Sequence, residues 1–331
     1  MNRITKIALL WSLALAFTLA CRALSPQGSA PELPVSTPIP TNQSGLESPI
    51  PASPIEPPVV STLTVPPKAP NPAASAPTST SLEKGGPPAD TTYAIILVAA
   101  DDILNVRSQP GPQAQIIGQL APDFIGITLT GDESTVGDQR WVEIRLPDAA
   151  TGWVNSRYLT EYKSPAEFCA DPQAGALIES LKAALSRRDG DQLAALVSPA
   201  HGLNLNYFRT GNRVQFSPQE AARLFDSQVP VNWGTQPASG MDISGIFQDE
   251  VLPKLDEVLS SPYDTACNDP ALGPNSYIFQ WPADYKNINF ISLAKPGSPG
   301  IELDWRNWLV GVEYVNGEPY VFALMQLFWE P

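Results

Sequence analysis

The cysteines and the histidine are the residues of this sequence with the widest choice of chemistry. The 331-residue chain contains three cysteines, Cys21, Cys169 and Cys267, and one histidine, His201. A cysteine nucleophile needs a base such as histidine beside it, and a zinc site needs several His or Cys ligands. One histidine is too few for a zinc-dependent hydrolase, and no metal or cofactor is predicted. His201 follows Pro199 in a turn, where an exposed or hydrogen-bonded loop histidine is a better interpretation than a catalytic one.

Carboxylates are the remaining candidates for catalysis. Glycoside cleavage needs only two of them at a suitable separation, which a sequence cannot measure. One stretch has Lys254 as its only cation and is rich in acidic residues, namely Asp242, Asp249, Glu250, Asp256, Glu257, Asp264 and Asp269. The first interpretation is a solvated acidic face. A calcium site, which takes oxygen ligands, and a catalytic pair are the alternatives.

Tryptophans are unusually frequent in the last third of the chain, at Trp233, Trp281, Trp305, Trp308 and Trp329. Trp305 and Trp308 fall on opposite sides of an extended chain, so one is expected to line a pocket while the other enters the core. Core packing is predicted for most of the five. A small-molecule pocket with aromatic walls is the alternative.

The net charge is carried by residues 93–331. This part holds 15 Lys and Arg against 29 Asp and Glu, which accounts for the whole net charge of −14. A partner bound through phosphates, nucleic acid included, is therefore not expected. The sequence also lacks a phosphate-binding Gly-rich loop and a Gly-x-Ser-x-Gly elbow.

The N-terminus has the features of an export signal. Positive charges precede an apolar run over residues 7–20, which is too short to cross a bilayer as a helix. Residues 18–21, Thr-Leu-Ala-Cys, resemble a bacterial lipoprotein signal, which implies removal of residues 1–20 and acylation of Cys21. Thr18 departs from the Leu, Val or Ile usual at its position and also fits ordinary signal cleavage, so a secreted protein is the alternative.

If Cys21 carries lipid, Cys169 and Cys267 are left as an even pair in a compartment where disulfides persist. We expect a disulfide between them, which would leave neither thiol free as a nucleophile. The bridge would close a loop of about 100 residues, and chain-entropy reasoning gives it roughly 4.7 kcal/mol before any native strain. Two buried free thiols are the alternative.

Residues 21–92 are predicted to form a disordered linker on the lipid anchor. Of the 36 prolines, 17 lie in residues 22–92, which contain no Phe, Trp or Tyr. This composition favours extended polyproline segments and cannot build a core. We therefore interpret it as a spacer that holds the folded part away from the membrane.

A small all-β module is predicted over residues 93–162. Short runs rich in β-branched and aromatic residues recur about every ten residues, separated by turn residues. The predicted strands cover residues 93–100, 103–107, 116–120, 125–130, 141–146 and 152–154. The predicted core residues are Leu104, Val106, Ile117, Val142, Ile144, Val154 and Leu159.

Four segments of this module resemble the bacterial Src-homology-3 (SH3) domain family: Leu-Asn-Val-Arg-Ser-Gln-Pro-Gly at 104–111, Ile-Gly at 117–118, Trp-Val-Glu-Ile at 141–144 and Gly-Trp-Val-Asn-Ser-Arg-Tyr-Leu at 152–159. The resemblance implies a barrel of about five to seven strands that often binds cell-wall peptides or other extracellular ligands. Gln109 stands where the family commonly has Gly, which should change the turn rather than the fold.

The candidate ligand-binding residues of this module are Asn105, Arg107, Trp141, Trp153 and Tyr158. The two tryptophans are expected to be half core and half groove wall, because an indole can bury its rings and keep its N–H available. For Arg107, a structural hydrogen bond across the loop at residues 110–112 is the favoured alternative.

From residue 163 to 331 we predict an α+β domain with helices packed on an antiparallel sheet. Apolar residues at helical spacing indicate a helix over 173–188, Asp191 is expected to cap a second helix through Val197, and further helices are predicted from 218 to about 225 and over 246–259. Strands are predicted at 203–208, 276–281, 288–293, 308–314 and 320–328, with an Asn316-Gly317 hairpin turn. In layout the domain is similar to the nuclear transport factor 2-like cone.

The sequence thus predicts a multidomain, non-enzymatic lipoprotein on the outer face of the membrane, a monomer that binds a cell-envelope or extracellular ligand. The alternative is a secreted glycan hydrolase that uses the SH3-like barrel as a targeting module.

Overall fold

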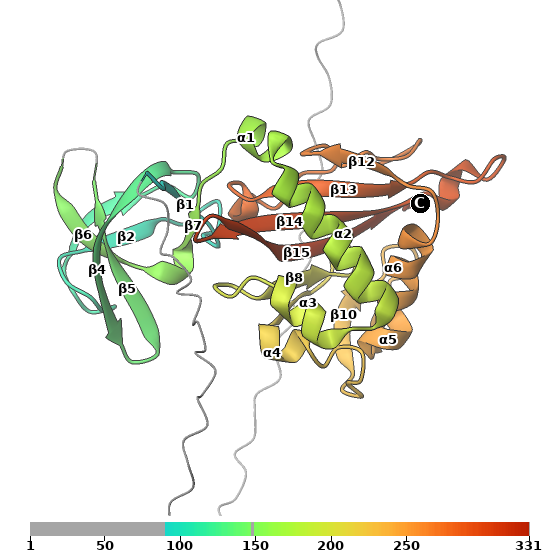
Figure 1. The fold of residues 1–331 in the computed structure, drawn as a ribbon, viewed down its shortest axis with the longest axis horizontal. Coiled ribbons are helices and arrows are strands. Elements are labelled where there is room, and N and C mark those ends of the chain that lie inside the picture. Colours follow the sequence, from blue (N-terminus) through green and yellow to red (C-terminus); the bar gives the residue numbers. More distant parts are fainter. Residues whose placement is uncertain (1–89, 147–148, 331) are drawn as a thin grey trace, which may run out of the picture. The chain divides into compact units, whose positions relative to one another are not determined.

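The computed structural model describes residues 90–146 and 149–330. The predicted signal peptide at 1–20, the predicted lipidation site Cys21 and residues 21–89 of the predicted linker lie outside the described residues, so all three stay predictions. Within the described part, no helix combines the length and the apolar character needed to cross a bilayer. The described chain is mostly β-structure with few helices (Figure 1).

The first module consists of seven short strands: β1 Tyr93–Ile95, β2 Leu104–Arg107, β3 Ile116–Leu120, β4 Ile125–Val136, β5 Gln139–Arg145, β6 Thr151–Asn155 and β7 Leu159–Glu161, with a 3-10 turn at Ser156–Tyr158. They pair antiparallel in the order β3-β2-β6-β5-β4-β1-β7. Each predicted strand of this module is present. β4 is longer than predicted because it continues into a hairpin with β5, which turns at Gly137 in the left-handed conformation.

One apolar cluster fills the inside of these strands, and it contains six of the seven predicted core residues. Ile117 is the exception: the prediction was wrong, since its side chain is 45% exposed on β3, the edge strand of the order. Gly152 is needed for the close packing of β6, because a Cβ there would lie 2.5 Å from Cγ1 of Val106.

The second module contains six helices among the described residues: α1 Pro165–Ala170, α2 Pro172–Arg187, α3 Gly190–Leu196, α4 Pro218–Ala221, α5 Phe247–Glu250 and α6 Leu252–Leu259. The predicted apolar stripe of α2 is fully buried. The predicted cap of α3 was wrong by two residues. Arg188 leaves the helix in the left-handed conformation, so Asp189, rather than Asp191, accepts the hydrogen bond from the Gln192 amide.

The strands of this module are β8 Leu203–Asn206, β9 Arg213–Phe216, β10 Val231–Thr235, β11 Asp242–Gly245, β12 Asp264–Cys267, β13 Asn289–Lys295, β14 Arg306–Val315 and β15 Glu318–Phe328. β13, β14 and β15 pair antiparallel as predicted, and β12, which was not predicted, pairs antiparallel with β13. β8 pairs parallel to β15, so the sheet is mixed. Asn316 and Gly317 both have positive φ, as the predicted two-residue hairpin turn requires. β10 and β11 form a separate ribbon.

The central strands β14 and β15 are buried on both faces, which explains their continuous apolar sequence. Trp308 lies in the cluster under the helices and Trp305 in the cluster on the opposite face. The two indoles therefore point to opposite sides as predicted. Both are core, however, and the expectation that one of them lines a pocket was wrong.

Residues 276–281 do not form the strand that their alternation predicts. Tyr277, Phe279 and Trp281 pack against the cluster around Trp305, while Ile278 and Gln280 face solvent. Buried and exposed side chains do alternate along this segment, but the buried ones pack against the face of the sheet instead of belonging to a strand of it. Pro274 and Pro282, which lack an N–H for a ladder, flank the segment.

Strand pairing continues from the first module into the second, through β7 and β14, where Glu161 opposes Tyr314. The buried carboxylate of Glu161 accepts hydrogen bonds from the amides of Asn316, at 2.6 Å, and Gly317, at 2.8 Å. An acidic side chain of the first module thereby holds the β14–β15 turn.

Further contacts surround this pairing. The side-chain Nδ2 of Asn287 donates to the Ile95 carbonyl at 2.8 Å, and Ile96 packs with Tyr285 and Phe322 in one apolar cluster. The two modules are therefore joined by backbone pairing, side-chain hydrogen bonds and shared core.

The predicted disulfide is present in the structure. Cys169 of α1 and Cys267 of β12 are bonded, with their Cα atoms 5.7 Å apart and a separation of 98 positions in the sequence. The bond ties the start of the second module to the edge of its sheet, and it leaves neither cysteine as a nucleophile.

Replacing Glu161 with glutamine should lower the free energy of unfolding by about 1–3 kcal/mol, because a neutral amide cannot accept both backbone N–H bonds. Urea unfolding of the full chain measures this. Glu318→Gln, an exposed glutamate beside the same turn, is the control and should change stability by less than about 0.5 kcal/mol. Equal effects of the two substitutions would show that the turn does not depend on Glu161.

Candidate functional site

Four of the five predicted ligand contacts line one pocket of the first module. The pocket has a volume of about 330 Å³, and Asn105, Arg107, Trp141 and Tyr158 lie in its wall. Trp153 is half-buried on β6 and does not line this pocket. The structure thus brings four of the residues together, and ligand binding by any of the five stays a prediction.

Trp141 has the most unusual environment in this pocket. β5 places it in the wall, where its side chain is only 4% exposed. Its Nε1 is buried and has no hydrogen-bond partner within the described residues. A buried donor without an acceptor costs about 1–3 kcal/mol, so buried indoles normally have one. A ligand that brought a carbonyl or hydroxyl oxygen to this N–H would remove the cost.

Arg107 forms the structural hydrogen bond that was the favoured alternative for it. Its Nη1 donates to the Ala114 carbonyl at 2.6 Å, which closes the loop after β2. A guanidinium has five N–H donors, so this bond leaves donors for a ligand. Asn155, which the sequence analysis did not select, also lines the pocket, and its side chain caps the following 3-10 turn by accepting from the Arg157 amide.

A second, larger pocket of about 630 Å³ lies in the second module. Its polar wall includes Asn206, Arg209 and Arg213, none of which was predicted from the sequence to bind a ligand. The carboxylates that hold these arginines are Glu330 and Asp284, 121 and 71 residues further along the chain. No local pattern could connect partners so far apart.

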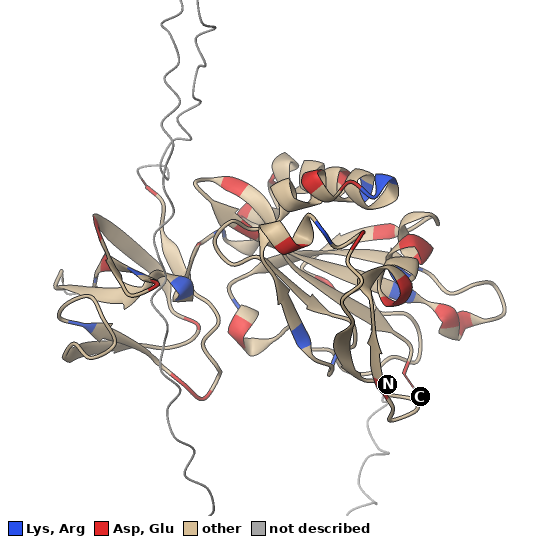
Figure 2. Cartoon of the chain, turned by 90° about the horizontal axis from the view of Figure 1, so that it is seen from below, with Lys and Arg blue, Asp and Glu red and all other residues tan. Residues whose placement is uncertain are grey.

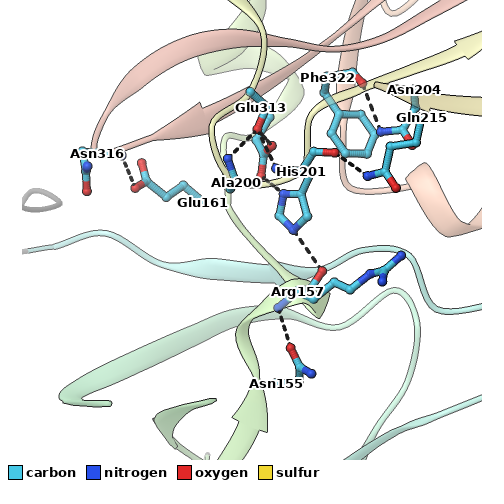
Figure 3. Close-up of polar contacts among 11 residues, drawn as sticks. Asn155, Arg157, Glu161, Ala200, His201, Asn204, Gln215, Glu313, Asn316 and Phe322 are labelled. Carbon is cyan, nitrogen blue, oxygen red and sulfur yellow. Dashed lines mark hydrogen bonds and ion pairs between the residues drawn. The ribbon is translucent and has the colours of Figure 1, made fainter. Parts of the chain in front are cut away.

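His201 lies buried where the two modules meet (Figure 3). Its Nδ1 is 2.6 Å from Oε1 of Glu313 on β14, and its Nε2 is 2.9 Å from the carbonyl oxygen of Arg157 in the first module. The sequence predicted that His201 is either exposed or hydrogen-bonded in a loop. The structure shows that it is hydrogen-bonded and that the prediction of an exposed side chain was wrong.

Ser198 adds a hydroxyl to this cluster, but the arrangement is not a nucleophile with its base. The Ser198 hydroxyl donates to Oε2 of Glu313 and accepts from the amides of Ala200 and His201. The histidine ring does not lie between serine and carboxylate, as it does in a Ser-His-Asp triad. The cluster therefore serves to join elements.

The contacts of the ring favour its protonated form. A backbone carbonyl only accepts, so Nε2 carries a hydrogen. A bare Nδ1 would place a lone pair against an ionised Glu313 carboxylate, so this contact favours a proton on Nδ1 as well. Burial alone lowers the pKa of His201, but the hydrogen bond and charge of Glu313, with the Arg157 carbonyl, outweigh it and raise the pKa above the ordinary value of 6.5.

Two of the seven acidic residues noted in the sequence form ion pairs with residues distant in the chain. Asp256 bonds to Arg188, and Glu257 lies within ion-pair distance of both Arg306 and Lys295. Over the residues that the structure describes, no three His, Cys, Asp or Glu side chains are grouped so that they could hold a metal ion.

The raised pKa of His201 predicts a stability that falls as the pH rises. At pH values below 6.5 the ring is protonated in both the folded and the unfolded chain, so the ion pair contributes fully. As the pH rises from 6.5 through the folded pKa, the unfolded chain has already lost the proton, and the free energy of unfolding should fall by at most about 1.4 kcal/mol per pH unit.

Because His201 is the only histidine, His201→Gln should flatten this dependence in urea titrations between pH 6 and 9. The same slope in the variant and the wild type would show that the proton is not held at this ring.

Comparison with known proteins agrees with the geometry of the first module. Residues 102–160 match the family described as the bacterial SH3 domain. No curated protein and no solved structure matched the chain, so the similarity of the second module to the nuclear transport factor 2-like cone stays a prediction. Bacterial SH3 domains are binding or targeting modules typical of extracellular or cell-surface proteins, and they commonly bind cell-wall ligands. Residues 102–160 of this chain are thus a bacterial SH3 domain.

Proposed function

We propose that this protein is a non-enzymatic binding protein of the cell surface, attached by a lipid on Cys21, whose SH3 domain holds a cell-envelope or extracellular ligand in the pocket beside Trp141. The unpaired Nε1 of Trp141 is the observation that carries the proposal. A folded chain tolerates a buried unpaired donor most readily where a ligand supplies the acceptor.

The other polar groups of the pocket support a ligand with a polar backbone. Asn105 and Arg107 both line the pocket, and the side chain of Gln119 donates to Oδ1 of Asn105 at 3.2 Å. Tyr158 packs its ring against the apolar core of the module while lining the same pocket. A peptide or an acetamido group offers the carbonyl oxygen and the N–H that such a wall can bond.

Binding is favoured over hydrolysis by the state of the carboxylates beside the larger pocket. Glu330 accepts from Nε and Nη2 of Arg209, and Asp284 accepts from both Nη atoms of Arg213. A general acid must carry a proton and a nucleophile must be free to attack, and a two-point bond to arginine disfavours both.

The pocket is tested by sedimentation of the full-length protein with purified bacterial cell-wall sacculi. Trp141→Phe keeps the aromatic volume and removes the N–H, so it should weaken binding about tenfold. Trp305→Phe is the matched control, because Nε1 of Trp305 is also buried without a partner but lies in the second module.

Equal binding by Trp141→Phe and the wild type would contradict the assignment of the pocket, and no sedimentation with any envelope fraction would contradict the function. Trp153→Phe examines the fifth predicted contact: weaker binding would extend the binding face to β6.

Lipid attachment is tested in a bacterial host fed with a labelled fatty acid. The wild type should incorporate label and fractionate with membranes, whereas Cys21→Ala should lose the label and leave the membrane fraction, because acylation requires that thiol. An unlabelled wild-type protein in the medium would support ordinary secretion in place of an anchor.

A further inference from the structure

The pocket of about 630 Å³ in the second module has the features of a built ligand site. It lies between the loop that joins β8 to β9, residues 278–282 and strand β15. Arg209 and Arg213 form part of the wall, and Phe279 and Met325 contribute apolar surface. None of these residues belongs to the SH3 domain.

Asn206 is a buried polar group in this pocket without a partner. It is the last residue of β8, is 6% exposed and lines the pocket. Its side-chain Oδ1 is buried and accepts no hydrogen bond from any described residue. Leaving such an acceptor unpaired is costly, and most buried polar side chains have a partner. Thr160, Tyr277, Tyr285 and Trp305 also have an unpaired buried atom, but Asn206 lines this pocket as well, so a ligand bound there would lie beside the unpaired residue.

The two arginines of the wall are held in the same way. Each guanidinium bonds through two nitrogens to a carboxylate, Arg209 to Glu330 and Arg213 to Asp284. Each also lies over a tyrosine ring, with its central carbon 4.1 Å from the centroid of Tyr277 and 4.2 Å from that of Tyr285.

These contacts orient both guanidiniums and leave N–H groups that are not used in the ion pairs. The positive charges of the wall are balanced by the two carboxylates. Asp and Glu are also spread over both modules of a chain whose net charge is −14 (Figure 2). Fixed N–H donors, a buried acceptor and no excess positive charge favour a neutral ligand that both donates and accepts.

The apolar residues complete the site. Met325 is buried in the sheet, Phe279 is half-buried, and Ile278 projects from the rim with 90% of its surface exposed. A pocket lined by both apolar and polar side chains suits a ring with a C–H face and hydroxyl edges. We propose that this pocket binds a neutral saccharide unit, whose hydroxyl or acetamido hydrogen bonds Asn206 Oδ1 and whose oxygens accept from Arg209 and Arg213.

The proposal is tested by calorimetric titration of the full-length protein with neutral trisaccharides, namely those of N-acetylglucosamine, β-linked glucose and α-linked glucose. Citrate and inorganic phosphate serve as anion probes. Asn206→Leu keeps the size of the side chain and removes the buried acceptor, so saccharide affinity should fall about tenfold or more. Its melting temperature should not fall, because an unpaired acceptor contributes nothing to the fold.

Two further variants separate binding from folding. Ile278→Ser changes only an exposed rim position and should weaken binding a few-fold with unchanged stability. Arg188→Gln is the matched control: Arg188 makes a two-point ion pair with Asp256 in the same module, away from the pocket, so saccharide affinity should not change. Trp141→Phe should also leave it unchanged, which separates this site from that of the SH3 domain.

Saccharide binding that depends on Asn206 and Ile278 would support the proposal. It is overturned if no trisaccharide binds at millimolar concentration, if affinity is the same in Asn206→Leu, or if only citrate or phosphate binds.

Discussion

The structure depends on hydrogen bonding that passes from the strands of the first module into the sheet of the second. β7 pairs with β14, and the buried carboxylate of Glu161 accepts the two amide hydrogens of the Asn316-Gly317 turn. A turn with two positive-φ residues needs its amides satisfied, and here a residue 155 positions earlier supplies the acceptor. The SH3 domain is thus bonded to the sheet beside it, and an isolated barrel would leave this carboxylate without its partners.

The buried ion pair of His201 and Glu313 strengthens the same junction by a different means. Burying a charge is unfavourable unless it is paired and hydrogen-bonded. Here the Glu313 carboxylate accepts hydrogen bonds from the imidazolium and from the Ser198 hydroxyl. The imidazolium also donates a hydrogen bond to the Arg157 carbonyl. Serine, histidine and glutamate lie together, yet their order prevents the histidine from acting as a base toward the serine. Residue types alone therefore say little about chemistry until their order in space is known.

The polar groups of the two pockets contrast with those of the junction. At the junction, Glu161, Ser198, His201 and Glu313 are all hydrogen-bonded, as expected for buried polar groups. In the pockets, Trp141 Nε1 and Asn206 Oδ1 are buried and unpaired within the described chain. Thr160, Tyr277, Tyr285 and Trp305 also have a buried side-chain atom without a partner among the described residues. What links Trp141 and Asn206 to ligands is therefore their place in the wall of a pocket. The two groups need opposite partners: the indole N–H needs an acceptor, and the amide oxygen needs a donor.

Local patterns in the sequence were enough to predict the first six strands of the SH3 module, the buried stripe of α2 and the hairpin at Asn316-Gly317, but not β7. The even count of cysteines left after Cys21 predicted the disulfide between Cys169 and Cys267. Local patterns also predicted four residues that meet in one pocket, because the resemblance to SH3 domains carried a known spatial arrangement. Where patterns failed, a distant contact decided the outcome. Residues 276–281 alternate like a strand but pack on a sheet face, β8 runs parallel to β15, and Ile117 lies on an edge.

The sequence also could not predict the partner of His201 or the carboxylates that bind the arginines of the second pocket. These partners lie 71 to 121 residues from the groups they hold. Alternation, caps and turns are set by neighbours within a few residues, so the sequence determined them by itself. Which buried group finds a partner, and which is left facing a pocket, depends on strand order and register across the whole sheet, and only the tertiary structure decides that.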